Sequence, residues 1–417
     1  MGTQTGALAQ RGAATAAGTV PTVPYPILID DGWTSVAGAT TALTLHRALY
    51  ELEDRLLPVS VARGADMGAR SVDFFYRFAK VIFVDNALDA YGATVTHEYV
   101  GHGARAREFG FRDVRYRFGA PFPFGGEAYT EYGSPSGWRL LSPTEEALLT
   151  VAGIEANNVG GKLNQLRAVR RGSMHYHDAL AHLVAYFDGF GYVLGTNPAD
   201  TSMGHDILAY LGVSAARYGV RGSRSGDVRR LQRQALLSLL NPYHLSALYG
   251  VASYVEFGRE RVRLPALRLR GGVRYVPWLR TALTPFGTDV VLENAFVRGE
   301  RLLDLSVRVG DGRYRAAWGL GMLAAGALRT GAASLDVTAD AWRQPAITVG
   351  GATIRERRGG YGGALSGTVT WELPPVPLVH APLGVVVQLG YKTPGFLEGE
   401  RLDRGVIARA GGSVRAP

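Results

Sequence analysis

The chain has 417 residues, of which 47% are apolar and 19% charged, and this is the composition of a folded protein with room for two or three domains. Its formal charge is +9, but the basic residues, nearly all of them arginines, are spread along the chain without a basic block, so nucleic-acid binding is not expected. No cysteine is present, which excludes disulfides and thiolate ligands and leaves His, Asp and Glu to build any metal site.

The first 40 residues are small and polar, and they predict a flexible N-terminal segment. Within it, Ala7-Leu8-Ala9 has the small-x-small form of a signal cleavage site, although the basic and apolar regions that precede such a site are missing. A truncated signal peptide and an ordinary tail rich in Ala, Gly and Thr are both open interpretations. No apolar run reaches the roughly 18 residues that a membrane-spanning helix needs.

Helical periodicity begins at residue 41, and leucines recur at spacings of three and four up to residue 57. Residues 73–109 form a second, aromatic-rich helical segment. A third helix is predicted to begin after Ser142, because a capping serine is followed three positions later by Glu145, and to end near Asn158. Further helices are predicted at 161–189, 204–213 and 226–257.

The second helical segment contains the sequence THEYVGHGARAREFG, in which His97 is followed by Glu98 and then by His102. The histidines of the usual zinc-protease signature are four residues apart, and here they are five apart. On an ideal α-helix a five-residue step leaves the two side chains about 140° apart, so they would not share one ion. One extra residue in the turn, a π-bulge, would realign them, and Gly101 lies where such a distortion costs least.

The pattern HExxGHG resembles the zinc motif of the dipeptidyl peptidase III family, with matching residues His97, Glu98, Gly101, His102 and Gly103. The resemblance covers about a dozen residues. It implies that the two histidines bind Zn²⁺ as a cofactor and that Glu98 is the general base. It also implies that a glutamate on a later helix is the third ligand.

A third ligand is also expected without the resemblance, because a catalytic zinc ion held by His97 and His102 would keep three protein ligands and one open position. Glu155 is the leading candidate, since it lies late in the capped helix in an apolar setting where a free carboxylate would be costly. The developing oxyanion needs a hydrogen-bond donor, and His177 and His182 on the following helix are the candidates for this catalytic role. Tyr129 and Tyr132 are candidates to line a substrate cleft.

From about residue 258 the sequence alternates with period two, as in Leu303–Val309, and turn residues separate the runs. Eight or nine strands are expected, arranged as an antiparallel meander closed into a β-barrel. One interpretation is an outer-membrane barrel with apolar residues facing lipid and charged residues, such as Arg308 and Asp340, inside. The other is a soluble barrel or sandwich with its polar face in water. The meander and the signal-like pattern favour the first.

The sequence therefore predicts an α+β protein, with a flexible segment at 1–40, a helical zincin-like domain at 41–257 and a C-terminal antiparallel β-barrel at 258–417. The leading hypothesis is a bacterial zinc metallopeptidase of the cell envelope that acts on a peptide or protein substrate and contacts outer-membrane lipid through the barrel. The alternative is a barrel-anchored binding or scaffold protein whose metal site is structural or degenerate, with Glu127 or His177 as a fourth ligand. A lipid-modifying hydrolase using the same ion is a third hypothesis.

Overall fold

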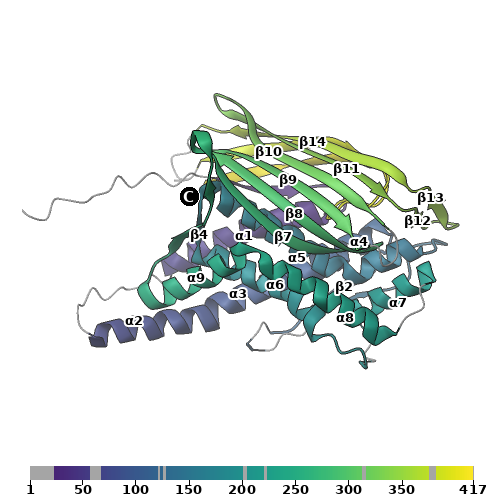
Figure 1. Cartoon of the computed structure of the whole chain (residues 1–417), viewed down its shortest axis with the longest axis horizontal. Helices are drawn as coiled ribbons and strands as arrows, with labels where there is room; N and C mark the ends of the chain where they lie inside the picture. The colour runs from purple at the N-terminus through teal and green to yellow at the C-terminus, as the bar shows by residue number, and fades with distance from the viewer. Residues whose placement is uncertain are drawn as a thin grey trace, which may run out of the picture.

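A computed structural model describes residues 23–56, 67–120, 123–124, 128–200, 204–219, 223–311, 316–374 and 382–416. Ala7-Leu8-Ala9 and Glu127 lie outside these ranges. The chain forms two layers, with one large antiparallel sheet lying over a layer of helices (Figure 1). Within the described ranges, no helix is both long enough and apolar enough to cross a membrane.

The helical layer confirms most of the predicted segments and extends several of them, but the helix expected at 161–189 is interrupted, because one helix ends at Arg171 and the next begins at Tyr176. Its third predicted helix, α5, begins with the expected cap, since the Ser142 hydroxyl accepts the Glu145 N–H and the Glu145 carboxylate accepts the Ser142 N–H. It continues past Asn158 and ends only at Gly172, whose positive φ of 77° terminates it. The helices are α1 Ser35–Leu56, α2 Met67–Lys80, η1 Val81–Asp85, α3 Asn86–Val95, η2 Thr96–His102, α4 Gly103–Glu108, α5 Pro143–Arg171, α6 Tyr176–Gly195, α7 Asp206–Tyr218, α8 Arg224–Ala235, η3 Leu236–Leu240, α9 Pro242–Phe257 and η4 Arg270–Gly272.

The large sheet has ten strands in the order β1-β16-β15-β14-β11-β10-β9-β8-β7-β6. Its members are β1 Val23–Ile29, β6 Leu267–Arg268, β7 Arg274–Thr284, β8 Gly287–Arg298, β9 Arg301–Gly310, β10 Trp318–Thr330, β11 Ala333–Gln344, β14 Gly360–Glu372, β15 Leu383–Lys392 and β16 Gly405–Ala416. Three small two-stranded sheets complete the fold, namely β2 Val114–Phe118 with β3 Ala128–Tyr132, β4 Ser173–His175 with β5 Arg261–Arg263, and β12 Ile347–Val349 with β13 Arg355–Arg357.

The antiparallel meander is therefore present, but the predicted closed barrel is not found. The strand order ends at β1 on one side and at β6 on the other, and the described residues show no pairing between these ends. Helix α5 packs against both sides of the opening, with contacts to β1 and to β7 and β8. Because the helical layer covers the inner side of the sheet, the strands need not close on themselves to bury it.

Strand β1 corrects two predictions about organisation. It lies within the segment expected to be flexible, yet it pairs along its whole length with β16, from Val23 opposite Ala416 to Ile29 opposite Ala410. The sheet thus begins before the helices and is completed after them, so residues 258–417 are not a separate unit. The stretch VPYPILI contains two prolines and no polar alternation, which is why it carries no recognisable strand signal.

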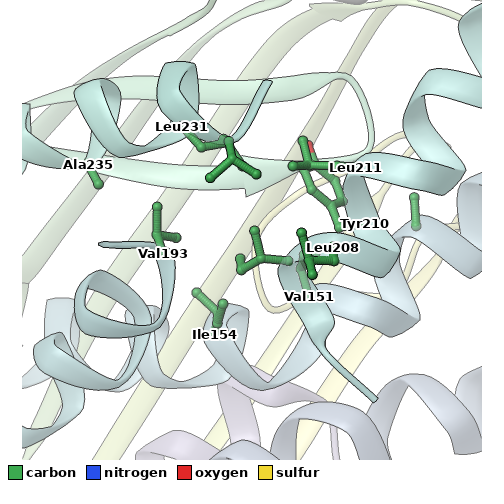
Figure 2. Packing of buried hydrophobic residues seen from close by; sticks show 11 residues of the cluster. Val151, Ile154, Val193, Leu208, Tyr210, Leu211, Leu231 and Ala235 are labelled. Carbon is green, nitrogen blue, oxygen red and sulfur yellow. The ribbon is translucent and has the colours of Figure 1, made fainter. Parts of the chain in front are cut away.

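The largest buried apolar cluster holds α5, α6, α7 and α8 together. Figure 2 shows Ile154 and Val151 of α5 facing Leu208 of α7, and Val193 of α6 lying beside them. These side chains are at most 7% exposed. The packing brings the first turn of α7 next to α5, and this placement builds the site described below.

Candidate metal centre

His97 and His102 face each other across one turn of η2. This segment is a π-helix, as the five-residue spacing predicts, and the Nε2 atoms of the two imidazoles are 3.2 Å apart. Gly101 allows η2 to lie directly against α5, because a Cβ at this position would be 2.5 Å from the carbonyl oxygen of Ala152. The distorted turn is therefore held by close backbone packing and not by the helix alone.

Asp206 supplies a third polar atom to the same point. Its Oδ2 lies 3.2 Å from the Nε2 of His97 and 3.2 Å from the Nε2 of His102. It is the first residue of α7, and its backbone N–H donates to the Tyr192 hydroxyl at 3.2 Å. Sequence reasoning missed Asp206. Its one signal is weak, an acidic residue that begins an otherwise apolar helix.

The outer nitrogens of both imidazoles are engaged. Nδ1 of His102 donates to the carbonyl oxygen of Leu149 at 2.8 Å, and Nδ1 of His97 lies 2.8 Å from Asp188, which also accepts the Asn157 amide at 2.8 Å. A carbonyl and a carboxylate accept hydrogen bonds, so they place the ring proton on Nδ1 of each histidine. The lone pairs of both Nε2 atoms then point to the centre, which is the usual arrangement around a metal-binding histidine.

The convergence of these atoms is suited to a bound cation. Two bare imidazole nitrogens and a carboxylate oxygen are all hydrogen-bond acceptors, and at 3.2 Å they repel one another unless a proton or a metal ion lies between them. Two nitrogens bound tetrahedrally to zinc at about 2.0–2.1 Å would be about 3.3 Å apart, close to the observed spacing. The three residues therefore fit a tetrahedral zinc ion that keeps one position open.

The charged groups around the site also favour a bound cation. Burial acts to lower the pKa of the His97 imidazole, but Asp188 and Asp206 outweigh it and raise that pKa well above its usual value. Burial acts to raise the pKa of the Asp206 carboxyl, but His102 and His97 outweigh it and lower that pKa. The two shifts indicate that the surroundings favour positive charge at the His97 imidazole and negative charge at the Asp206 carboxylate.

The three groups lie in a polar cavity of about 490 Å³ whose walls come from η2, β3, α6 and α7. Glu98 lines it, and its Oε2 accepts a hydrogen bond from the Thr130 hydroxyl at 2.6 Å. Tyr129 and Tyr132 of β3 also line it, in agreement with their predicted place in a cleft. Burial, and then Asp206 and Glu98, raise the pKa of the Tyr132 hydroxyl, so it stays protonated and able to donate.

Glu155, the predicted third ligand, does not reach this cavity. Its carboxylate binds Arg105, at 2.5 Å from Nη2 and 3.0 Å from Nε, and accepts the Gly399 N–H at 2.7 Å. The residue of α5 that faces the site is Gly153, where a Cβ would be 2.1 Å from Cδ2 of His97. Glu155 is two positions further along, about 200° around the helix, and so it points to the other side.

His177, a predicted oxyanion donor and alternative ligand, is buried elsewhere. It stacks on Tyr50 with ring centroids 3.5 Å apart and lies near Glu53 and Asp85, and the three titratable groups are spaced closely enough to hold an ion. Lys80 already supplies positive charge there, because its ammonium donates to Glu53 at 2.9 Å and to Asp85 at 3.1 Å. This second group is therefore a buried ion-pair network.

His182, the other predicted donor, pairs with a different histidine. Its Nε2 is 2.9 Å from Nδ1 of His244, and it is not among the residues that line the cavity around His97. Burial, and then His244, lower the pKa of the His182 imidazole well below its usual value, so this pair is neutral at physiological pH. Neither predicted donor lines the cavity that holds the converging imidazoles.

Comparison with models of protein families finds no match to this chain, and comparisons with curated proteins and with solved structures find no significant match either. The resemblance to the dipeptidyl peptidase III family thus stays at the level of the motif, and the zincin-like description of the helical part gains no support.

Proposed function

We propose that this protein is a zinc-dependent metallohydrolase in which His97, His102 and Asp206 hold the ion. The observation that carries the proposal is the meeting of two Nε2 lone pairs and one carboxylate oxygen, each about 3.2 Å from the others, in a cavity open to substrate. Three protein ligands and an open position are typical of catalytic zinc, whereas structural zinc has four protein ligands.

The side chains of the cavity supply the remaining roles. When bound, the zinc ion would provide Lewis-acid chemistry, polarising a carbonyl and making water more acidic. Glu98 follows His97 in the chain and lines the same cavity, and it would take the proton of the attacking water and return it to the leaving amine. The Tyr132 hydroxyl, kept protonated by its surroundings, would donate to the oxyanion, the role first assigned to His177 and His182.

The wall formed by β3 supports a peptide as the substrate. Ala128, Tyr129 and Thr130 of β3 line the cavity, and the only strand paired with β3 in the described residues is β2, on one side. An extended peptide can add itself to an unpaired strand edge by main-chain hydrogen bonds, and this would lay its carbonyl groups along the cavity. An ester-linked lipid would use the same ion and base but would gain nothing from the strand edge.

The alternative, a binding or scaffold protein with a structural metal, requires a fourth ligand. Among the described residues, the group around His97 contains only three suitably spaced His, Asp or Glu side chains, and His177 belongs to the separate network around Lys80. The position of Glu127 lies outside the described ranges. The three-ligand geometry therefore supports the hydrolase over the scaffold.

A metal and activity assay tests the proposal. The purified full chain should carry about one zinc ion and cleave a library of fluorogenic peptides. Glu98→Gln should keep the zinc but lose roughly 10²–10⁴-fold in kcat, which is the usual contribution of a general base. Glu131→Gln is the matched control, because Glu131 lies on β3 with an exposed side chain outside the cavity lining, and it should keep both zinc and activity. Zinc retained after both His97 and His102 are replaced by Ala would end the proposal.

A further inference from the structure

The large sheet has its polarity reversed relative to a sheet that faces water. We define its outer face from one row of residues that lie opposite one another across strands β8–β11 and β14–β16. The outer face consists of this row and of every second residue before and after it along each of these strands. The row is Asn294, Leu305, Met322, Ala339, Leu365, Tyr391 and Val406. All of its members except Asn294 are apolar or aromatic, and Leu365 and Val406 are 60% and 73% exposed.

Between the strand ends the outer face carries no charged residue. In the strands that define it, the charged outer positions are Arg298, Arg301 and Arg343, which lie at strand ends. The interior positions between them are apolar, small or, at Asn294, a neutral amide bonded to Tyr275 and to a neighbouring carbonyl oxygen. Exposed apolar area of this extent is costly in water, and monomeric soluble proteins rarely keep it.

The charged residues lie instead on the inner face, toward α5. Glu293 and Asp304 are 0% and 2% exposed, and Lys162 of α5 lies 2.9 Å and 3.5 Å from their carboxylates. Arg308 binds Asp340 at 3.0 Å on the same face. A sheet in water buries its apolar side and exposes its polar side, so this sheet has the arrangement expected in hydrocarbon.

The open edge at β1 is protected in a way that hydrocarbon would require. Backbone groups that face lipid must be hydrogen-bonded within the protein. At this edge the prolines 24 and 26 have no N–H, and the Pro26 carbonyl oxygen accepts from the Thr44 hydroxyl at 2.6 Å. The Leu28 N–H donates to the Thr41 oxygen at 2.9 Å, and the same hydroxyl donates to the Leu28 carbonyl at 3.0 Å.

Both threonines belong to α1, and this helix also carries exposed apolar side chains. It carries an exposed leucine stripe, and each member is at least 52% exposed. The stripe consists of Leu45, Leu49, Leu52 and Leu56. Its spacing of three and four residues places the leucines along one side of the helix.

Aromatic side chains mark the two ends of the outer face at a distance that matches a bilayer. Tyr361 and Trp371 lie on β14 ten positions apart, and they are 82% and 56% exposed. At about 3.3 Å per residue and a strand tilt of about 40°, ten residues span a height of about 25 Å, the height of the apolar band in membrane-embedded sheets. Trp318 lies beside Tyr361, with ring centroids 6.2 Å apart.

We propose that the outer face of the large sheet lies in the hydrocarbon core of a lipid bilayer. Four observations support lipid as the occupant: the reversed polarity, the absence of charge between the strand ends, the hydrogen-bonded edge at β1, and aromatic ends at bilayer spacing. A protein partner on the outer face would require neither the hydrogen-bonded edge at β1 nor the aromatic ends at bilayer spacing. The proposal does not depend on the metal centre, and either can fail without the other.

Spin labelling tests this proposal, because the chain contains no cysteine and each variant therefore carries a single label. Leu365→Cys and Leu389→Cys place labels on the outer face, where both side chains are about 60% exposed and their replacement removes no buried contact. Trp138→Cys is the control, since Trp138 is 94% exposed and lies outside the large sheet. The labelled full chain is reconstituted in phosphatidylcholine vesicles, and collision rates with oxygen and with a water-soluble nickel chelate are measured.

The labels at 365 and 389 should collide with oxygen more often than with the nickel chelate, because oxygen concentrates in hydrocarbon and the chelate is excluded from it. The label at 138 should show the opposite order. Access of the chelate to 365 and 389 in vesicles would overturn the proposal. So would exclusion of both reagents, which would mean that a protein surface, such as a second copy of the chain, covers the outer face. Failure of the chain to float with the vesicles would overturn it as well.

Discussion

The third zinc ligand proposed from the folded site is Asp206, whereas the sequence predicts Glu155, and substitutions at these two residues distinguish the alternatives. Asp206→Asn replaces the anionic oxygen that lies 3.2 Å from both imidazole nitrogens with a neutral amide of the same size. Loss of a residue that only supports a ligand weakens metal binding by about 10–100-fold. Removal of a ligand should weaken metal binding more than this, so we expect zinc affinity to fall more than about 100-fold, or by more than about 2.7 kcal/mol.

Glu155→Gln should have a different effect. The carboxylate it removes binds Arg105 in the protein interior, and breaking a buried ion pair costs about 3–5 kcal/mol of folding free energy. Glu108 remains 2.6 Å from another nitrogen of Arg105, so the cost should lie near the lower end, about 3 kcal/mol. The variant should be less stable, yet its folded fraction should still carry zinc.

Two measurements separate these outcomes. Zinc content per folded protein is determined by elemental analysis after gel filtration, and the free energy of unfolding is determined by urea titration of the zinc-free proteins. Asp206→Asn should lose zinc with little change in stability, and Glu155→Gln should lose stability but not zinc. The reasoning would be refuted if folded Glu155→Gln lacked zinc while Asp206→Asn retained it.

Three further results are expected. Asp188→Asn removes the carboxylate that orients the His97 ring, so zinc should bind about 10–100-fold more weakly in competition with a chromogenic chelator, and unchanged affinity would contradict the assigned role. Gly153→Ala would put a carbon 2.1 Å from the His97 ring and should abolish zinc binding, whereas Gly161→Ala, with nothing within 4 Å, should retain it; zinc bound equally by both would disprove the packing argument. Burial raises the pKa of the Asp85 carboxyl to about 7, so the folded state keeps a proton that the unfolded state releases above about pH 4. Asp85 should therefore make the free energy of unfolding fall as pH rises from about 4 to about 7, and Asp85→Asn should reduce the slope measured in urea titrations by the contribution of one carboxyl; an unchanged slope would be the contrary result.

Local features of this protein could be predicted where the causes are local. The five-residue spacing of His97 and His102, with Gly101 between them, predicts a π-helix because only that geometry turns both rings to one side. The capping box at Ser142 predicts the start of α5 for a similar reason, since all the groups that satisfy it lie within four residues. Period-two alternation likewise predicts the antiparallel meander of β7 to β16.

Distant contacts could not be predicted in this way. Glu155 was a reasonable ligand because a lone buried carboxylate needs a partner, but which cation it meets depends on how α4 packs on α5, and Arg105 is the one that reaches it. Asp206 has no distinguishing pattern of its own. It becomes a candidate ligand only because the apolar cluster of α5 to α8 brings the start of α7 to the imidazoles.

The sheet shows the same division. Alternation along the strands determined that one face would be apolar and the other polar, but alternation reads the same whichever face is turned to the helices. Only the tertiary structure decided that the charged face lies on α5 and the apolar face lies outside. The physical reason is that a residue's own sequence neighbours set its backbone geometry, whereas the partner that satisfies a buried charge or covers an apolar face is set by packing between segments far apart in the chain.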